Sequence, residues 1–249
     1  MVLRALVTRP EADARALSDL LQARDIMPVL APLLTIIPNP QAVPELERIQ
    51  AILFTSANGV RALAALLPAD SPAFALPVFC VGDQSARCAS DLGFGTAESA
   101  GGDLAGLAAL VKSRLDPLAG PLYHAAASKL AGDLAALLEE AGFILRRQTL
   151  YEAHKAACLP DPAATGLAAG DLDFALFFSP RTATAFVSLV TQEGFGEACR
   201  EMTAYALSAA VADVLKELPW RRISVASRPD MESLLAVLDA DLAAGRLVQ

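Results

Sequence analysis

The sequence predicts an α/β protein of two lobes, each built on a parallel sheet, and three observations support this prediction. Short apolar runs alternate with amphipathic helical segments along the chain, which is typical of parallel sheets covered by helices on both faces. Hydrophobic residues make up 54% of the sequence and aromatic residues only 6%, which favours a helix-rich α/β protein over an all-β sandwich. One strand–turn–helix pattern occurs twice, and 249 residues suffice for two modest domains.

The expected elements follow in order from the N-terminus. Residues 3–7 form a strand, and residues 11–24 form an amphipathic helix whose leucines share one face. Residues 33–37, bracketed by two prolines, form an extended connector. The passage after Tyr151 is rich in Pro, Ala and Gly, and no helix or strand is assigned to it before residue 174. The remaining strands are expected at residues 28–31, 51–54, 77–81, 121–125, 143–147, 174–178, 203–207 and 222–225.

The repeated pattern is the turn Phe54-Thr55-Ser56, which recurs as Phe177-Phe178-Ser179. Each copy ends an apolar run and begins a helical segment, at residues 58–67 and 181–190. A serine at such a turn caps the helix by accepting a hydrogen bond from its free backbone N–H groups. The positive end of the helix dipole then favours an anion beside the sheet edge. The doubled turn therefore predicts two similar lobes that face one site.

Two further matches, in the same order along the chain, support a duplication. Residues 17–26 resemble residues 134–143, and the turn at Val81-Gly82 resembles the turn at Leu207-Ser208. Helices rich in Ala and Leu resemble one another in any protein, but three matches in one order favour two homologous lobes.

A division into lobes with comparable numbers of strands makes one lobe discontinuous. The inserted lobe comprises residues 37–152, and the other lobe combines residues 1–36 with residues 153–249. Two connectors then cross between the lobes, at residues 33–37 and 147–153, and both are extended enough to pair with each other. The cleft between the lobes is the expected active site.

Composition and charge exclude several classes of function. The net charge is −8 and no basic run is present, so we expect no nucleic-acid partner. No uncharged apolar run approaches the roughly 20 residues that a membrane-spanning helix needs, so we expect no membrane association. Arg4 interrupts the first apolar residues too early for a secretory signal, so we expect a cytoplasmic protein.

The sequence offers little to a metal or a cofactor. The four cysteines form no C-x-x-C pair, and His124 and His154 lie far from other residues at metal-ligand spacing. For His124, at the end of a strand, a buried structural role is favoured over a functional one. No phosphate-binding loop, dinucleotide fingerprint or G-x-S-x-G elbow is present. We therefore expect no metal and no cofactor.

Small hydroxyl side chains follow the predicted strands. Open α/β sheets bind ligands at the carboxyl ends of their strands, so these hydroxyls together predict a polar rim for an anion. Each one alone is explained equally well as a helix cap. The hydroxyls are those of Thr8, Ser56, Ser85, Ser179 and Ser208.

Arginines near the same turns, and one tyrosine, complete the set of candidate site residues. Arg9 and Arg181 lie at the turns and suit contacts with carboxylates, whereas Arg61 is better explained as a surface charge. Tyr151, near the crossing between the lobes, carries a hydroxyl suited to proton transfer. A half-buried structural tyrosine explains Tyr151 equally well on the pattern alone.

Several segments together resemble the uroporphyrinogen-III synthase family. They lie in the order found in that family and cover essentially the whole chain. The segments are residues 6–10 (LVTRP), 52–60 (ILFTSANGV), 81–86 (VGDQSA), 141–143 (AGF), 150–152 (LYE), 177–181 (FFSPR), 207–212 (LSAAVA) and 225–229 (VASRP).

The resemblance implies two flavodoxin-like lobes, joined by a two-stranded connector, that bind the substrate between them without a cofactor. The implied substrate is hydroxymethylbilane, a linear tetrapyrrole polycarboxylate of porphyrin and heme biosynthesis. The family, a cyclising hydro-lyase, closes it to uroporphyrinogen III with inversion of the D ring and loss of water. The terminal hydroxyl departs to leave an azafulvene cation, and ring attack and rearrangement follow. Such a reaction depends more on holding the folded chain than on a nucleophile.

The resemblance also assigns roles to residues. Ser56, Ser85 and Ser179 are carried over as binding residues, and Tyr151 as the proton donor to the leaving hydroxyl. Relatives carry a glycine- and arginine-bearing turn after the fourth strand, whereas this chain has residues 124–129 (HAAASK), where Lys129 either takes over an anion contact or contributes nothing. The expected substrate-binding residues are Thr8, Arg9, Ser56, Ala57, Asn58, Gly82, Ser85, Lys129, Ser179, Pro180, Arg181 and Ser208.

The alternative function is a two-lobed binding protein for a small anionic ligand, without catalysis. A transferase that uses a nucleotide-activated donor is disfavoured because the phosphate-binding loop is missing. We expect a monomer that makes a transient contact with the enzyme that forms hydroxymethylbilane.

Overall fold

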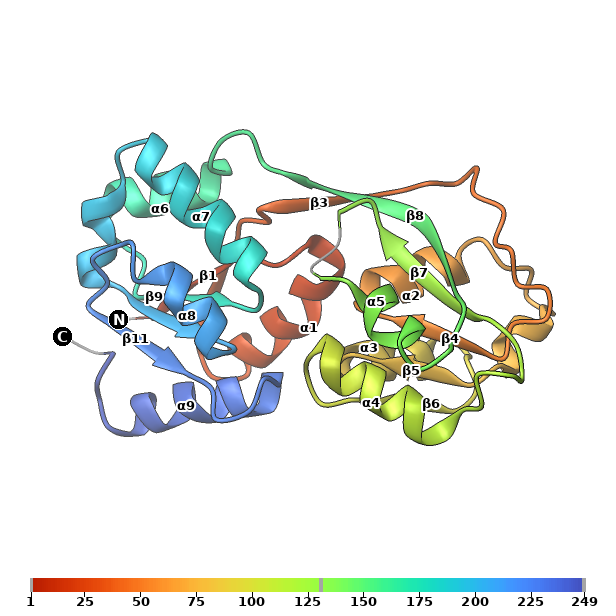
Figure 1. Cartoon of the computed structure of the whole chain (residues 1–249). Helices are drawn as coiled ribbons and strands as arrows, with labels where there is room; N and C mark the ends of the chain where they lie inside the picture. Colours follow the sequence, from red (N-terminus) through yellow and green to blue (C-terminus); the bar gives the residue numbers. More distant parts are fainter. Residues whose placement is uncertain (1, 130–131, 248–249) are drawn as a thin grey trace. The chain divides into compact units, whose positions relative to one another are not determined.

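The computed structural model describes residues 2–129 and 132–247, and the chain divides into two compact units (Figure 1). The split unit consists of Met1–Thr35 and His154–Gln249, and the inserted unit consists of Ile36–Ala153. Each unit has its own sheet and its own apolar clusters on both faces of that sheet.

The split unit is a five-stranded parallel sheet in the order β11-β10-β9-β1-β2. Numbered along the unit this order is 2-1-3-4-5, the flavodoxin-like order. Its strands are β1 (Arg4–Val7), β2 (Met27–Leu30), β9 (Phe174–Phe177), β10 (Thr203–Ala206) and β11 (Arg222–Val225). Its helices are α1 (Glu11–Gln22), α6 (Asp161–Ala169), α7 (Pro180–Gln192), α8 (Ala209–Leu215), α9 (Met231–Ala243) and the 3-10 helix η2 (Gly196–Glu201).

The inserted unit is a six-stranded sheet in the order β3-β8-β7-β4-β5-β6, and β4 to β8 pair in parallel. Its strands are β3 (Leu34–Pro38), β4 (Ala51–Phe54), β5 (Val78–Cys80), β6 (Ala97–Ser99), β7 (Leu122–Ala127) and β8 (Leu145–Lys155). Its helices are α2 (Ala57–Ala64), α3 (Asp83–Asp91), α4 (Leu104–Arg114), α5 (Leu134–Glu139) and the 3-10 helix η1 (Pro72–Ala75).

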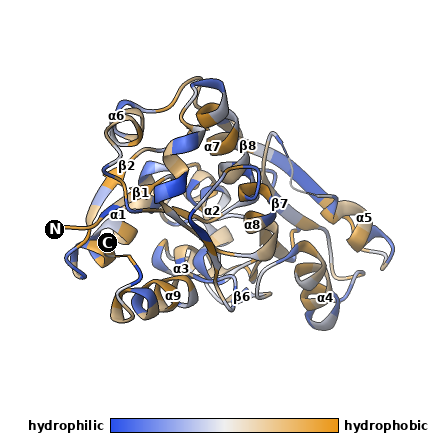
Figure 2. Ribbon diagram, turned by 90° about the vertical axis from the view of Figure 1, so that its left-hand side faces the viewer, coloured by the Kyte–Doolittle hydropathy of each residue, from blue (hydrophilic) through white to orange (hydrophobic). Residues whose placement is uncertain are grey.

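Alternating residues of the central strands enter different cores. In β4, Ile52 and Phe54 belong to the apolar cluster that includes residues of α2, whereas Ala51 and Leu53 belong to the cluster that includes residues of α4 and α5. This alternation is the period of two that a strand imposes on its side chains. Figure 2 shows the complementary pattern in the helices, most of which carry hydrophobic residues along one side and hydrophilic residues along the other.

The two units repeat one strand order, as the doubled turn predicted. Strands β4, β5 and β6 and the helices after them correspond to β9, β10 and β11, and β7 and β8 correspond to β1 and β2. The order reverses between β4 and β7 in the inserted unit and between β9 and β1 in the split unit. Ligands of open α/β sheets bind at such switch points, at the carboxyl ends of the strands. The prediction of two flavodoxin-like lobes with parallel sheets is confirmed.

Two segments that connect the units are strands and lie next to each other in sheet order. The Asn39 N–H donates to the Leu150 carbonyl, and the Ala156 N–H donates to the Leu33 carbonyl. Residues 33–37 were expected to be extended, and most of them form β3. The expected strand at residues 143–147 starts two residues too early and overlaps the eleven-residue β8, which begins at Leu145 and continues through Tyr151. The first part of β8 is hydrophilic after Leu145 (Figure 2). The strand therefore continues well beyond the apolar residues that predicted it.

Helix α6 and strand β6 were absent from the sequence-based expectation. Helix α6 occupies the passage rich in Pro, Ala and Gly. Proline and glycine are compatible with a helix here because they lie at its ends: Pro162 is in the first turn, and Gly170 ends the helix in the left-handed conformation (φ 65°). Strand β6 has only three residues, none of them fully buried, and so leaves no apolar run in the sequence.

Gly59 allows α2 to lie close to β7. A Cβ atom at Gly59 would lie 2.6 Å from the Ala125 carbonyl oxygen, which is shorter than real Cβ contacts. Because that neighbour is backbone in the middle of a sheet, it cannot move aside as a flexible side chain can. The turn before α2, with Ser56, therefore depends on a glycine at this position.

We predict that Gly59→Ser lowers the free energy of unfolding by about 1–3 kcal/mol, the usual cost of overpacking. The matched control is Gly82→Ser, because Gly82 also lies at the start of a helix but has open space around its Cβ position. Serine is a favoured residue at this N-cap, so the control should match or exceed the stability of the wild type. Equal stabilities of the two variants in urea unfolding would contradict the prediction.

Candidate active site

Ser56 and Tyr151 form a hydrogen-bonded pair at the switch point of the inserted unit. Ser56 is the N-cap of α2, with extended backbone (φ −160°, ψ 155°), and its Oγ accepts a hydrogen bond from the Gly59 N–H at 3.3 Å. The same oxygen lies 2.7 Å from the hydroxyl oxygen of Tyr151. The Ser56 hydroxyl thus caps a helix and contacts a phenol at once.

A β-bulge in β8 directs Tyr151 toward Ser56. Ala126 is paired with Thr149, but the next residue, Ala127, is paired with Tyr151, so Leu150 has no partner in β7. Side chains of a regular strand alternate between faces, whereas Leu150 and Tyr151 are both buried in the same apolar cluster. The bulge therefore brings the phenol to the face where α2 begins.

The other predicted residues of the inserted unit lie at the starts of α2 and α3 and at the end of β7. Ala57 is buried, and the Asn58 side-chain oxygen accepts a hydrogen bond from Arg61 at 2.8 Å. Gly82 is the N-cap of α3, and Ser85 is buried within the first turn of that helix. Lys129 is exposed after β7, at the last residue before the gap in the described chain.

In the split unit the second copy of the turn has the same capping geometry. Ser179 is the N-cap of α7 (φ −154°, ψ 149°), and its Oγ accepts from the Thr182 N–H at 3.1 Å and lies 2.9 Å from the Thr182 hydroxyl. Pro180 occupies the first turn, and Arg181 is exposed there. Ser208 has the N-cap position of α8, but its side chain makes no capping hydrogen bond.

Thr8 and Arg9 are built into the split unit. The fully buried Thr8 hydroxyl donates to the Leu176 carbonyl at 3.0 Å and so links β1 to β9. The Arg9 guanidinium is also buried, 3.5 Å from the Asp13 carboxylate and 4.2 Å from the centre of the Phe178 ring. Both residues border the switch point, and these contacts hold their side chains in place.

Each unit thus brings part of the predicted set together. In the inserted unit, Ser56 and Tyr151 are in contact. In the split unit, Thr8 bonds to Leu176 of β9, and Arg9 lies over Phe178, the residue before Ser179. Thr8, Arg9 and Ser179 therefore lie near the same switch point. A hollow of about 360 Å³ that includes Thr184 and Val214, and one of about 70 Å³ beside Tyr123, contain none of the predicted residues.

Two polar residues, His124 on β7 and Arg147 on β8, were not among the predicted site residues. His124 is buried, and its Nε2 lies 3.4 Å from the Thr55 hydroxyl. Arg147 is paired with His124 in the sheet register. The parallel-strand rule applied to the ends of the expected strands at 121–125 and 143–147 would have placed both residues at one edge.

Among residues 2–129 and 132–247, no group of three or more His, Cys, Asp or Glu is placed to hold a metal ion, and no helix is long and apolar enough to cross a membrane.

The family model of uroporphyrinogen-III synthase HemD matches residues 15–236. The chain belongs to the uroporphyrinogen-III synthase family. The function predicted from the sequence, a uroporphyrinogen-III synthase of the lyase class, is thereby confirmed, and a binding protein without catalysis is not favoured. No protein with a curated function matches the chain in sequence.

Solved structures of uroporphyrinogen III synthases share the fold. The Helicobacter pylori protein has 17% sequence identity and a TM-score of 0.60, with 96% of this chain and 99% of that chain covered. A mutant of the Thermus thermophilus protein has 19% identity and a TM-score of 0.54, with 97% and 99% covered. At these identities the similarity concerns the fold alone.

The buried imidazole of His124 makes stability depend on pH. Burial, with a smaller contribution from the positive charge of Arg147, lowers the pKa of His124 from 6.5 to about 4. Between these values the unfolded chain binds a proton that the folded chain does not. The free energy of unfolding should therefore fall as the pH drops from about 6.5 to about 4, by on the order of 3 kcal/mol.

Urea unfolding as a function of pH tests this prediction. His124→Gln should flatten the pH dependence in that window, whereas His154→Gln, at the only other and exposed histidine, should retain it. If His124→Gln and the wild type lose stability in parallel, His124 is not the group responsible.

Proposed function

We propose that this chain cyclises hydroxymethylbilane to uroporphyrinogen III, with inversion of the D ring and loss of water, and that Tyr151 protonates the leaving hydroxyl. The observation that supports this role is the 2.7 Å contact between the Tyr151 hydroxyl and Ser56 Oγ at the start of α2. This contact joins a proton donor to a chain of backbone and side-chain dipoles.

The proposed proton transfer requires one direction in this chain of hydrogen bonds. The Gly59 N–H donates to Ser56 Oγ. Either hydroxyl can donate in the contact between Ser56 and Tyr151, and in this proposal Ser56 donates to the Tyr151 oxygen and Tyr151 donates to the substrate. Each hydrogen bond polarises the next one, and donation to the phenol oxygen stabilises the charge that develops there as the proton leaves.

The chemistry then proceeds on the substrate. The C–O bond of the terminal hydroxymethyl group breaks, and the oxygen leaves as water with the proton from Tyr151. The electrons of the pyrrole stabilise the remaining carbon as an azafulvene cation, which ring D attacks before the rearrangement. Proton loss from the new macrocycle regenerates the phenol. The protein supplies a proton and a conformation, and the proposal involves no cofactor.

The substrate carboxylates bind, in this proposal, at the helix starts of both units. The first N–H groups of a helix have no partner within it and favour an anion. Arg181 and Lys129, both exposed, add positive charge beside such turns. The remaining binding residues in the proposal are Thr8, Arg9, Ser56, Ala57, Asn58, Gly82, Ser85, Ser179, Pro180 and Ser208.

Cellular context forms a separate part of the proposal. We infer a cytoplasmic monomer that contacts the hydroxymethylbilane-forming enzyme transiently. Because the linear substrate also closes spontaneously to the type I isomer, direct delivery would limit that loss.

The activity is tested with enzymatically generated hydroxymethylbilane and separation of the product isomers. The purified protein should yield the type III macrocycle faster than the type I isomer forms without protein. Formation of the type I isomer alone, at the rate seen in buffer, would overturn the proposed function.

Tyr151→Phe is expected to lower kcat about 100-fold, within the usual range for the loss of a general acid. Tyr123→Phe is the matched control, because Tyr123 is a buried tyrosine of the same unit whose hydroxyl donates to Gln148 at 2.6 Å. The control should retain the wild-type kcat within about twofold. Turnover by Tyr151→Phe at the wild-type rate would exclude Tyr151 as the donor without affecting the family assignment.

A further inference from the structure

His124 combines deep burial with an unused ring nitrogen. Its side chain lies in the middle of β7 with 2% of its surface exposed, and Nε2 interacts with the Thr55 hydroxyl. Within residues 2–129 and 132–247, the other ring nitrogen, Nδ1, has no hydrogen-bond partner. A ligand atom that accepts a hydrogen bond from Nδ1 would therefore add an interaction that this ring lacks within the described residues.

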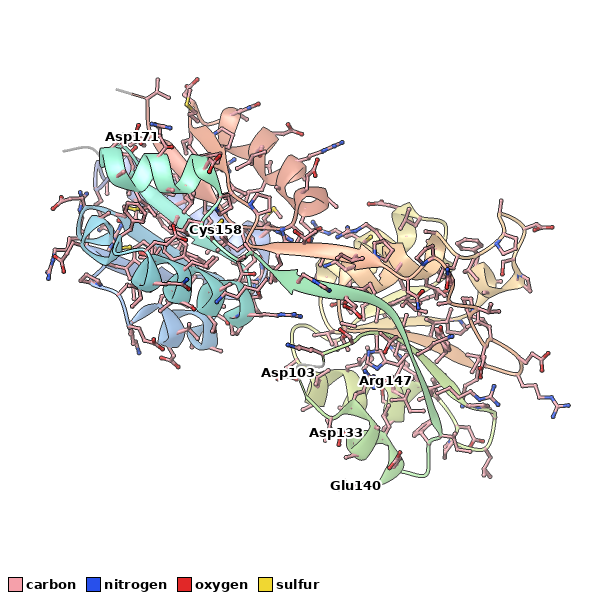
Figure 3. All side chains as sticks on the ribbon, turned by 90° about the horizontal axis from the view of Figure 1, so that it is seen from above. Asp103, Asp133, Glu140, Arg147, Cys158 and Asp171 are labelled. Atoms are coloured by element: carbon pink, nitrogen blue, oxygen red, sulfur yellow. The ribbon has the colours of Figure 1, made fainter. Side chains whose placement is uncertain are left out.

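Arg147 is fixed beside this imidazole. The side chain is exposed on β8 (Figure 3), but its Nη2 donates to the carbonyls of Ala127 at 3.1 Å and Ser128 at 3.4 Å. These bonds anchor the guanidinium at the end of β7, and within the described part of the chain they involve Nη2 alone. The charge of Arg147 is one of the two causes that keep the pKa of His124 low.

The two side chains come from paired residues of neighbouring strands, and both can donate hydrogen bonds. The neutral imidazole can donate from Nδ1 when the Thr55 hydroxyl donates to Nε2, and the guanidinium donates from a planar fork that matches a carboxylate. Thr55 immediately precedes Ser56, so this pair of donors lies one residue from the Ser56–Tyr151 contact.

We propose that His124 and Arg147 form a carboxylate-binding point on the inserted unit that takes one acetate or propionate side chain of the substrate. This inference rests on the proposed function. The proposal adds Arg147, from the neighbouring strand β8, to the predicted Lys129 as a positive charge near the end of β7. A carboxylate held there would fix the substrate close to the proposed proton donor.

The matched pair Arg147→Gln and Arg146→Gln tests the proposal. Both arginines are exposed neighbours on β8, but Arg146 donates to the Glu47 carbonyl instead of the end of β7. Arg147→Gln should raise KM for hydroxymethylbilane about 10-fold with kcat within about twofold, as expected for a lost charged hydrogen bond. Arg146→Gln should leave KM within about twofold of the wild type. Equal KM values for the two variants would overturn the proposal.

A binding measurement separates this inference from the proposed function. Uroporphyrin III, a fluorescent octacarboxylate, is titrated into the wild type and both variants, with no turnover required. Weaker binding to Arg147→Gln alone, with a shallower salt dependence, supports the site even if the activity assay fails. Formation of type III product by the wild type, with uroporphyrin bound equally by all three proteins, retains the function and overturns the site.

The role of His124 is tested by His124→Phe and His124→Gln. Phenylalanine fills the space but has no donor, so KM should rise about fivefold or more, whereas glutamine restores a side-chain N–H and should recover most of that loss. Circular dichroism shows whether His124→Phe folds. If it does not, His124→Gln combined with Arg147→Gln is compared with Arg147→Gln alone. Wild-type KM in folded His124→Phe, or equal KM in the combined and single variants, would remove His124 from the site.

Discussion

The hydroxyl of Ser56 serves two partners, and the arrangement of the inserted unit at its switch point depends on both. As an acceptor from the Gly59 N–H it ends the strand β4 and begins the helix α2. As the neighbour of the Tyr151 phenol, 2.7 Å away, it links that helix to β8, which lies two strands from β4 in the sheet. Because the same hydroxyl makes both contacts, the position of the Tyr151 phenol is fixed relative to the start of α2. That is a rigid element of the fold, unlike a long loop.

Backbone irregularities in two places make this contact possible. The bulge opposite Ala126 and Ala127 turns Tyr151 to the same face as Leu150, and the missing side chain at Gly59 lets α2 approach the Ala125 carbonyl. Both features involve β7 or its partner strand. The last residues of β7 therefore connect the phenol, the helix start and the pair of His124 and Arg147.

The prediction from sequence succeeded where one residue pattern determines one element. The runs before Ser56 and Ser179 are apolar throughout because central parallel strands are buried on both faces, and the serines mark where the helices begin. The same logic located β8 only in part, because its polar residues leave no apolar run, and it missed α6, whose proline and glycine mark its two ends. The contact between Ser56 and Tyr151 was beyond sequence reasoning, because it depends on a bulge that shifts the pairing by one residue.

The two copies of the turn keep the same backbone but differ in what the serine hydroxyl meets. Ser179 interacts with Thr182 of its own helix, whereas Ser56 interacts with a tyrosine from a different strand. The equivalent of β8 in the split unit is β2, a four-residue strand that carries no tyrosine. A duplicated turn thus provides two anion-receptive helix starts but only one phenol. The proposed chemistry follows this asymmetry: both turns hold carboxylates, and the inserted unit alone supplies the proton.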